Sequence, residues 1–256
     1  AISFSCFGIS TWSARLPSVI GAIITSIYLF LSACPLIGEK AARRGAFIFA
    51  TSLEIIILAR SAVTDTTLLL ALTVAMMSFA RKKYISAYTA CGVALLAKGP
   101  IGFGFPALIV GLWLLLTKQL NLTNIMKLRW IWGIPLACLI GLPWFIYMSI
   151  YHGSTFTDTF LGYHNITRFI TPEHEGQNHI WMYFLVLTAG FFPWTGTIPL
   201  IFSYVKHWKQ NKVLMYFIVW ASFIFVFFSL SSTQLFSYIL PMYPPLALLS
   251  GYAITK

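Results

Sequence analysis

The stretch LPSVIGAIITSIYLFLSACPLIG, from Leu16 to Gly38, decides the fold class of this chain. It carries no charged residue, and about 20 consecutive apolar residues are enough to cross a lipid bilayer as an α-helix. The whole chain shares this character, with 59% hydrophobic and 9% charged residues, whereas an average soluble domain is about half apolar and a quarter charged. The sequence therefore predicts an all-α membrane protein, in which residues 1–256 form part of a single polytopic helical bundle.

Eight further apolar runs follow, and with the first they predict about nine transmembrane helices in this chain. Four of the runs contain only about 14 residues each, which at about 1.5 Å per residue is shorter than the hydrocarbon core of about 30 Å. Either the turns between them are drawn into the membrane, or each helix continues through the flanking Ser, Thr and Ala residues. The runs are 46–59, 66–80, 84–97, 103–116, 130–150, 181–205, 213–230 and 238–255.

The basic residues form clusters at regular spacing, and this spacing orients the predicted helices. Cytoplasmic loops of membrane proteins are enriched in Lys and Arg, so we assign the clusters to the cytoplasm. The net charge of +11 then reflects membrane topology and needs no nucleic acid partner. The clusters are Lys40, Arg43 and Arg44; Arg81, Lys82 and Lys83; Lys118, Lys127 and Arg129; and Lys206, Lys209 and Lys212, with Lys256 at the end.

One long polar loop (151–180) interrupts the apolar chain, and its core reads YHGSTFTDTFLGYHNITRFITPEHEGQNH from Tyr151 to His179. It holds three of the six acids and four of the five histidines. Polar groups without partners cost several kcal/mol inside hydrocarbon, so the loop must lie in water or line a wet cavity. The alternation of basic clusters places it on the outer side. Each outer base is either an interfacial snorkeller or part of an anion-binding site; these bases are Arg15, Arg60, Lys98 and Arg168.

Asp65 and Lys98 are the candidates for chemistry at the outer ends of the helices. Asp65, at the end of ARSAVTD, either caps the helix predicted from Thr66 or takes part in a reaction, and one role does not preclude the other. Lys98 lies in LLAKGPIG, where Gly99 and Pro100 predict a tight turn that holds the ammonium at the outer rim. Because no acid lies nearby in the sequence, we expect this cation to bind a lipid phosphate and not a protein carboxylate.

Three other polar features each allow two interpretations. Glu54, deep in an apolar run, is either protonated or paired with a neighbouring helix, and carboxylates within the membrane are functional hypotheses by default. His164 and Arg168 are four residues apart and would share one face of a helix. His174 lies between two glutamates and either makes structural hydrogen bonds or binds a metal. We favour hydrogen bonds and predict no metal site; His164 and His174 would be the ligands if one existed.

Eight short motifs follow one another along nearly the whole chain. Together they resemble bacterial membrane glycosyltransferases of the protein O-mannosyltransferase-like superfamily, and most of all the group that transfers 4-amino-4-deoxy-L-arabinose to lipid A. The ordered set is much more specific than any one motif. The motifs are SARLPS (Ser13–Ser18), ARSAVTD (Ala59–Asp65), LLAKGPIG (Leu95–Gly102), GLPWF (Gly141–Phe145), GYHNITRF (Gly162–Phe169), PEH (Pro172–His174), GFFPW (Gly190–Trp194) and SLSSTQLFSYILPMYPP (Ser229–Pro245).

The resemblance implies a helical bundle of the GT-C type in the bacterial inner membrane, with an active site that faces the periplasm. Such enzymes take a sugar from undecaprenyl phosphate and pass it to a phosphate of lipid A or to another acceptor. The donor lipid is a substrate, no cofactor is obligatory, and a metal requirement is left open. Catalytic roles then fall to Asp65 and Lys98, and substrate binding to Arg15, His164, Arg168 and Tyr238, with Arg60 as a further base near the same phosphate.

Two departures from the family pattern bear on activity. Gln234 and Ser237 occupy positions where the family often has Lys and His, so the phosphate or sugar contacts of those residues are in question. The first helix and first periplasmic loop of the family, with an acidic motif and a Lys-Pro-Pro turn, would precede Ala1. We therefore expect this chain to be a fragment that is inactive by itself.

Two alternatives to this function stay open at the level of sequence. A transporter or flippase of a lipid-linked anion would use the same outer bases as a binding site, but would need polar access from both faces. A protein O-mannosyltransferase would transfer its sugar to a hydroxyl group, and a carboxylate such as Asp65 would then accept the proton. Lipid transport without sugar transfer would identify the transporter.

Overall fold

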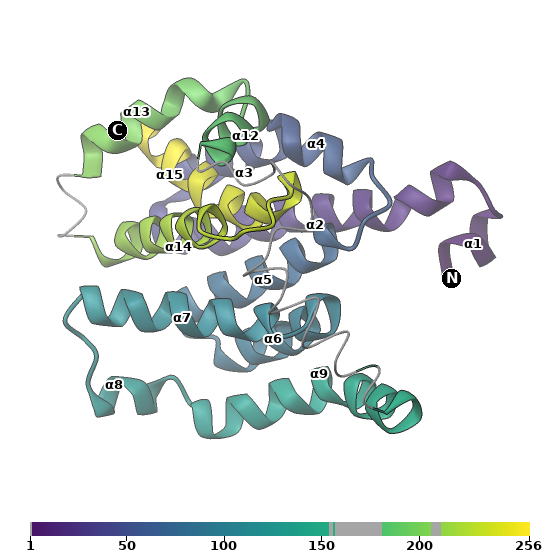
Figure 1. Cartoon of the computed structure of the whole chain (residues 1–256). Helices are drawn as coiled ribbons and strands as arrows, with labels where there is room; N and C mark the ends of the chain where they lie inside the picture. The colour runs from purple at the N-terminus through teal and green to yellow at the C-terminus, as the bar shows by residue number, and fades with distance from the viewer. Residues whose placement is uncertain (1, 154–155, 157–180, 206–210) are drawn as a thin grey trace.

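The computed structural model describes residues 2–153, 156, 181–205 and 211–256, which form an all-α bundle with two short 3₁₀ segments and no β-strand (Figure 1). The prediction of an all-α fold is confirmed. The elements are α1 (Ile2–Phe7), α2 (Thr11–Ile37), α3 (Glu39–Thr51), α4 (Leu53–Ala59), α5 (Asp65–Ala80), α6 (Tyr84–Lys98), α7 (Ile101–Leu116), α8 (Leu122–Lys127), α9 (Trp130–His152), α12 (Met182–Gly190), η2 (Trp194–Thr197), α13 (Ile198–Val205), α14 (Lys212–Ser229), η4 (Phe236–Met242) and α15 (Tyr243–Thr255).

Among the described residues, α2, α9 and α14 are each long and apolar enough to cross a membrane. A fourth crossing is possible if α12 and Trp194–Ser203, which meet at an angle of 107°, form one broken span. Three of the four shorter runs, 66–80, 84–97 and 103–116, form the helices α5, α6 and α7 close to their predicted bounds. The number of nine crossings stays a prediction.

Two predicted crossings are broken, and the two breaks pack against each other. The run 46–59 is interrupted at Ser52, whose backbone is extended (φ −68°, ψ 134°), and the run 181–205 is interrupted near Pro193, which cannot continue a helix. The backbone N–H of Leu53 donates to the carbonyl oxygen of Phe192 at 3.0 Å. The indole Nε1 of Trp194 donates to Thr51 Oγ1 at 2.8 Å. These hydrogen bonds pair polar groups that the helix breaks would otherwise leave without a partner in an apolar environment.

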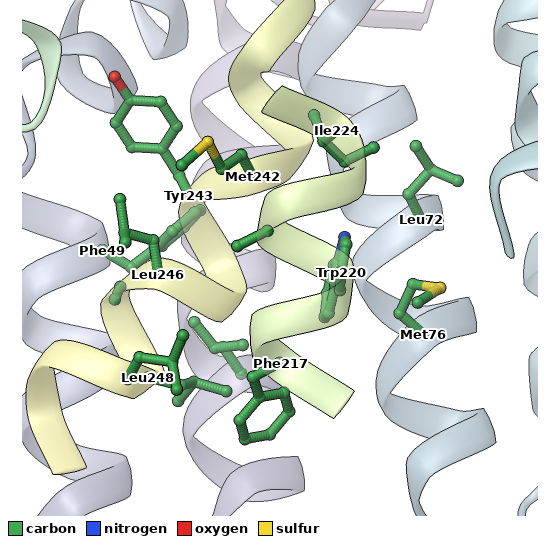
Figure 2. Packing of buried hydrophobic residues seen from close by; sticks show 14 of the residues in the cluster. Phe49, Leu72, Met76, Phe217, Trp220, Ile224, Met242, Tyr243, Leu246 and Leu248 are labelled. Carbon is green, nitrogen blue, oxygen red and sulfur yellow. The ribbon is translucent and has the colours of Figure 1, made fainter. Parts of the chain in front are cut away.

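The core lies where α14 packs between α15 and α5 (Figure 2). Trp220 of α14 is 1% exposed, and the hydroxyl of Tyr216 donates to the carbonyl oxygen of Met76 in α5 at 2.8 Å. Close approach of α3 and α15 depends on glycines, because a Cβ on Gly251 would lie 2.4 Å from the backbone nitrogen of Gly45. Small residues at such crossings are typical of packed membrane helices.

The helices alternate in direction, so that the described basic clusters collect at one end of the bundle (Figure 1). α5 begins at Asp65 and α6 ends at Lys98, so these two residues lie at the opposite end from the 81–83 turn that joins the two helices. One detail differs from expectation. The first basic cluster does not form a loop; it follows Glu39 into the first turns of α3, where Arg44 donates to the carbonyl oxygen of Ile254 at 2.9 Å.

Glu54 is buried with 6% of its surface exposed and accepts a hydrogen bond from the hydroxyl of Tyr243 in α15. Its pairing with a neighbouring helix, one of the two interpretations, is therefore what the structure shows. The second carboxyl oxygen has no hydrogen-bond partner within the described residues. Gly190 makes room for this pair, since a Cβ there would lie 2.4 Å from the Tyr243 hydroxyl oxygen and 2.5 Å from Glu54 Oε2.

Replacing Tyr243 with phenylalanine is expected to lower the free energy of unfolding by about 1.5 kcal/mol, because it leaves a buried carboxyl group without a partner on either oxygen. Thermal unfolding of the purified protein in detergent measures this effect. Tyr252→Phe, in the same helix, is the matched control, since the Tyr252 hydroxyl makes no hydrogen bond with the described residues. Equal unfolding temperatures for the two variants would contradict the stabilising role of the Glu54–Tyr243 bond.

Candidate functional site

Asp65, Lys98 and Tyr238 meet in space, although they lie far apart in the sequence. Lys98 Nζ forms an ion pair with Asp65 and donates a hydrogen bond to its Oδ1. The same ammonium lies 4.9 Å from the centroid of the Tyr238 ring, within the range of a cation–π contact. Three of the motifs, ARSAVTD, LLAKGPIG and the SYILP part of the last one, therefore converge on one point, which we name the Asp65–Lys98–Tyr238 cluster.

Asp65 is the first residue of α5, so capping, one of the two roles considered for it, is not what the structure shows. The N-cap is Thr64, which makes no side-chain capping bond. The carboxylate of Asp65 is instead engaged by Lys98. A negative charge in the first turn still interacts favourably with the helix dipole, so the position suits an ionised aspartate.

Lys98 is the last residue of α6, and glycines fix the turn that follows it. Gly99 has a φ of +69°, a backbone conformation that residues other than glycine rarely adopt. Its N–H donates to the carbonyl oxygen of Leu95 at 2.7 Å. Gly102 lets α7 fold directly back onto α6, since a Cβ there would lie 2.2 Å from the backbone carbon of Ala94. The glycines of the LLAKGPIG motif therefore fix the backbone turn that holds the Lys98 ammonium at one end of α6.

Tyr238 lies in η4, the 3₁₀ segment that precedes α15. Its ring packs on Phe228 at a centroid distance of 5.1 Å, and Phe228 packs in turn on Phe105 of α7 at 5.5 Å. This aromatic contact chain connects α7, α14 and η4. It holds the Tyr238 ring beside the Lys98 ammonium.

The ion pair is partly withdrawn from water, with the Lys98 and Asp65 side chains 30% and 16% exposed. The expectation that Lys98 lacks a carboxylate partner was wrong, because antiparallel packing brings the start of α5 against the end of α6. An ammonium has three N–H donors, and Asp65 accepts from one of them. The cation can therefore be held by Asp65 and still bind an oxyanion of a ligand.

Arg15 and Arg60 are exposed and form no ion pair with any acid in the described part of the chain. Arg15 lies on α2, next to the segment that leads into Asp65, because the hydroxyl of Ser18 donates to the carbonyl oxygen of Val63 at 3.2 Å. Arg60 is the C-cap residue that follows α4, and it lines a cavity of about 220 Å³ between α2 and the α3–α4 break. Both guanidinium groups belong to the same end of the bundle as Lys98, without contacting it.

The predicted loop residues His164, Arg168 and His174 lie outside the described residues, and their proposed roles stay predictions. Within the described ranges no group of three His, Cys, Asp or Glu side chains is arranged to hold a metal ion. The four cysteines are free thiols.

Gln234, one of the two departures from the family pattern, is buried, which its sequence does not predict. It is 2% exposed, and its Oε1 has no hydrogen-bond partner among the described residues. The sequence marks Gln234 as a departure from the family pattern within the polar turn SLSSTQ, but gives no sign of its burial. Ser237, the other departure from the family pattern, is half-buried one residue before Tyr238.

Relatives of known sequence match the chain over nearly its entire length. An uncharacterized protein of Aquifex aeolicus (strain VF5) is 30% identical over 256 residues, covering 100% of this chain and 58% of that protein. The undecaprenyl phosphate-alpha-4-amino-4-deoxy-L-arabinose arabinosyl transferase of Shewanella sediminis (strain HAW-EB3) is 30% identical over 271 residues, covering 99% of this chain and 48% of that protein. The chain thus spans about half the length of the curated relatives it matches.

The fold is also that of a solved structure. The crystal structure of ArnT from Cupriavidus metallidurans bound to undecaprenyl phosphate superposes with a TM-score of 0.90 at 24% identity, covering 100% of this chain and 48% of that one. The same protein in the apo state gives a TM-score of 0.86. At this identity the likeness establishes the fold, and it confirms the predicted GT-C type of helical bundle.

The family model described as dolichyl-phosphate-mannose-protein mannosyltransferase matches residues 1–147, more than half of the chain. This region contains both Asp65 and Lys98, and the pair they form connects two of the motifs on which the resemblance rests. The chain belongs to the dolichyl-phosphate-mannose-protein mannosyltransferase family.

Proposed function

We propose that this chain is part of a membrane glycosyltransferase that moves a sugar from undecaprenyl phosphate to lipid A phosphate or another acceptor. The sugar is 4-amino-4-deoxy-L-arabinose or a related one, as in the relative from Shewanella sediminis. The protein lies in the bacterial inner membrane, and the Asp65–Lys98–Tyr238 cluster faces the periplasm, opposite the lysine-rich end. The convergence of Asp65, Lys98 and Tyr238 is the observation that carries this proposal.

The reaction breaks one bond and forms another at the anomeric carbon of the sugar. An oxygen of the acceptor supplies the electron pair of the new bond, and undecaprenyl phosphate leaves with the electron pair of the old one. Negative charge therefore grows on the leaving phosphate. Lys98 stabilises that charge through its remaining N–H donors in a site that is partly shielded from water, where a preorganised charge has a large effect.

Asp65 positions the Lys98 ammonium beside the ring of Tyr238. A phosphate acceptor is already an anion and needs no base. A hydroxyl acceptor would need one, and Asp65 serves that purpose poorly while it is engaged in the ion pair. The arrangement therefore favours a phosphate acceptor, and Arg15 and Arg60 at the same end are further cations for the two phosphate groups.

The experiment that tests this function reconstitutes the full-length protein in liposomes. Undecaprenyl phosphate with labelled 4-amino-4-deoxy-L-arabinose is the donor, and lipid A is the acceptor. We expect the label to move to lipid A, with strong loss in Asp65→Ala and Lys98→Ala. Movement of the labelled lipid between leaflets without transfer would contradict the proposal in favour of a transporter. Transfer of mannose to a peptide hydroxyl would replace it with protein O-mannosylation.

A further inference from the structure

A cavity lined by three lysines lies at the lysine-rich end of the bundle, away from the Asp65–Lys98–Tyr238 cluster. Its volume is about 340 Å³, and residues near the end of α7 and the start of α14 contribute to its lining. Lys82, Lys127 and Lys212 line it, from three segments that are distant in the sequence. The two sites lie at opposite ends of α6, which is about 22 Å long because it has 15 residues that each rise about 1.5 Å.

Within the described part of the chain, no carboxylate pairs with these three lysines. The lining contains no Asp or Glu, and the ion pairs of the described residues are Arg43 with Glu39 and Lys98 with Asp65. A cavity of this size with three uncompensated ammonium groups is a site for an anion.

Hydrogen bonds hold the cavity walls in place. The indole N–H of Trp113 donates to the carbonyl oxygen of Lys212 at 3.0 Å, which ties the end of α7 to the start of α14. Asn124 Nδ2 donates to the carbonyl oxygen of Gln119 at 2.9 Å, and Lys127 Nζ donates to Asn124 Oδ1 at 3.4 Å. The polar rim is therefore preorganised, which lowers the entropic cost of binding a ligand.

Lys82 occupies a backbone position that glycine usually takes. α5 ends in a Schellman motif, with the Lys83 N–H bonded to the carbonyl oxygen of Ser78 at 2.8 Å and Lys82 at the left-handed residue, with a φ of 58°. Glycine is the usual residue there because a side chain at positive φ is strained. Lys118 repeats this geometry at the end of α7, with a φ of 55°, but it does not line the cavity.

Apolar side chains form one wall of the cavity, among them Phe79, Val110, Leu114 and Val213. A free phosphate ion would use only the lysine rim, whereas a phospholipid would place its phosphate among the lysines and its glycerol and upper acyl chain against the apolar wall. Basic pockets at the cytoplasmic ends of membrane helices bind anionic headgroups in this way.

We propose that this cavity binds the headgroup of an anionic glycerophospholipid, with Lys82, Lys127 and Lys212 around its phosphate. The site is independent of sugar transfer and of the proposed function. It anchors the α5–α6 turn, α8 and the start of α14 to the lipid on the lysine-rich side of the membrane.

The test measures binding of short-chain phosphatidylglycerol to the purified full-length protein in neutral detergent by titration calorimetry, with phosphatidylcholine of the same chains for comparison. We expect wild-type protein to prefer phosphatidylglycerol. Lys82→Gly should weaken this binding about fivefold, and the combination of Lys82→Gly, Lys127→Gln and Lys212→Gln about 100-fold, since each lysine near the headgroup contributes a similar factor. Lys118→Gly, which removes the same charge and the same backbone strain outside the cavity, should bind like wild type.

Two outcomes would overturn the proposal. Unchanged phosphatidylglycerol binding in the triple variant would mean that the lysines serve topology alone. Displacement of the lipid by millimolar inorganic phosphate or glycerol 3-phosphate would identify a soluble anion as the ligand. Because binding is the readout, a failure here is distinct from a failure of sugar transfer, and thermal unfolding of each variant separates loss of binding from loss of fold.

Discussion

Replacing Lys98 with methionine is expected to lower kcat/KM for sugar transfer by about 100- to 1,000-fold, the range for losing one preorganised group that stabilises a developing oxyanion. Methionine keeps most of the length and apolar character of the side chain but removes the charge. The packing against Tyr238 is then largely retained. The measurement is transfer of labelled sugar in liposomes at donor concentrations well below KM.

Asp65→Asn should have a smaller effect, about tenfold, because Lys98 keeps its charge but loses the ionic partner that positions it. The double variant Asp65→Asn with Lys98→Met should be no worse than Lys98→Met alone, since residues that act as a unit are not additive. Lys118→Met, at the other end of the bundle, is the control and should transfer sugar normally. Losses that simply multiply in the double variant would refute a joint role for Asp65 and Lys98.

Gly102→Ala is expected to lower the free energy of unfolding by about 3 kcal/mol, at the upper end of the cost of overpacking. The added Cβ would lie 2.2 to 2.4 Å from the backbone of Ala94 and Leu95. Backbone atoms cannot turn away as a side chain can, so α6 and α7 must separate. Lys98 lies at this junction, and we also expect loss of transfer activity. Thermal and denaturant unfolding in detergent measure the change in stability.

Gly104→Ala is the matched control, two residues further along α7. Apart from its immediate neighbours in α7, no atom of the described residues lies within 4 Å of a Cβ at this position, and alanine is a better helix former than glycine by up to about 1 kcal/mol. We therefore expect Gly104→Ala to be neutral or stabilising. The close approach of α6 and α7 thus predicts stability changes of opposite sign for Gly102→Ala and Gly104→Ala. Equal stabilities of the two variants would show that the helices do not approach this closely.

Most of the helices could be predicted from the sequence because apolar runs of this length have no other stable arrangement in a bilayer. The predicted run 66–80 begins one residue after α5 does, and the run 213–230 is offset by one residue from α14. The breaks were missed for two reasons. Pro193 is a helix-breaking residue within an otherwise apolar run, but apolar periodicity alone does not show where a run breaks. Ser52 differs little from other small polar residues in helices.

The candidate site was only partly predictable. The sequence indicates Asp65 and Lys98 as separate candidates for chemistry. Their ion pair depends on the antiparallel packing of α5 and α6, which cannot be predicted from any local sequence pattern. Tyr238 was reached through family resemblance alone, since an aromatic residue in an apolar segment is ordinarily part of the core. The partner of Glu54 could not be predicted from the sequence either, because Glu54 and Tyr243 lie in elements that are distant in the sequence.

The most direct test of the central claim is a structure of the full-length protein with undecaprenyl phosphate bound. We predict a phosphate oxygen at hydrogen-bonding distance from Lys98 Nζ, about 2.7–2.9 Å, with Asp65 still paired to the same ammonium. A phosphate bound elsewhere, with Lys98 and Asp65 unchanged and more than about 6 Å from it, beyond direct ionic contact, would contradict the account.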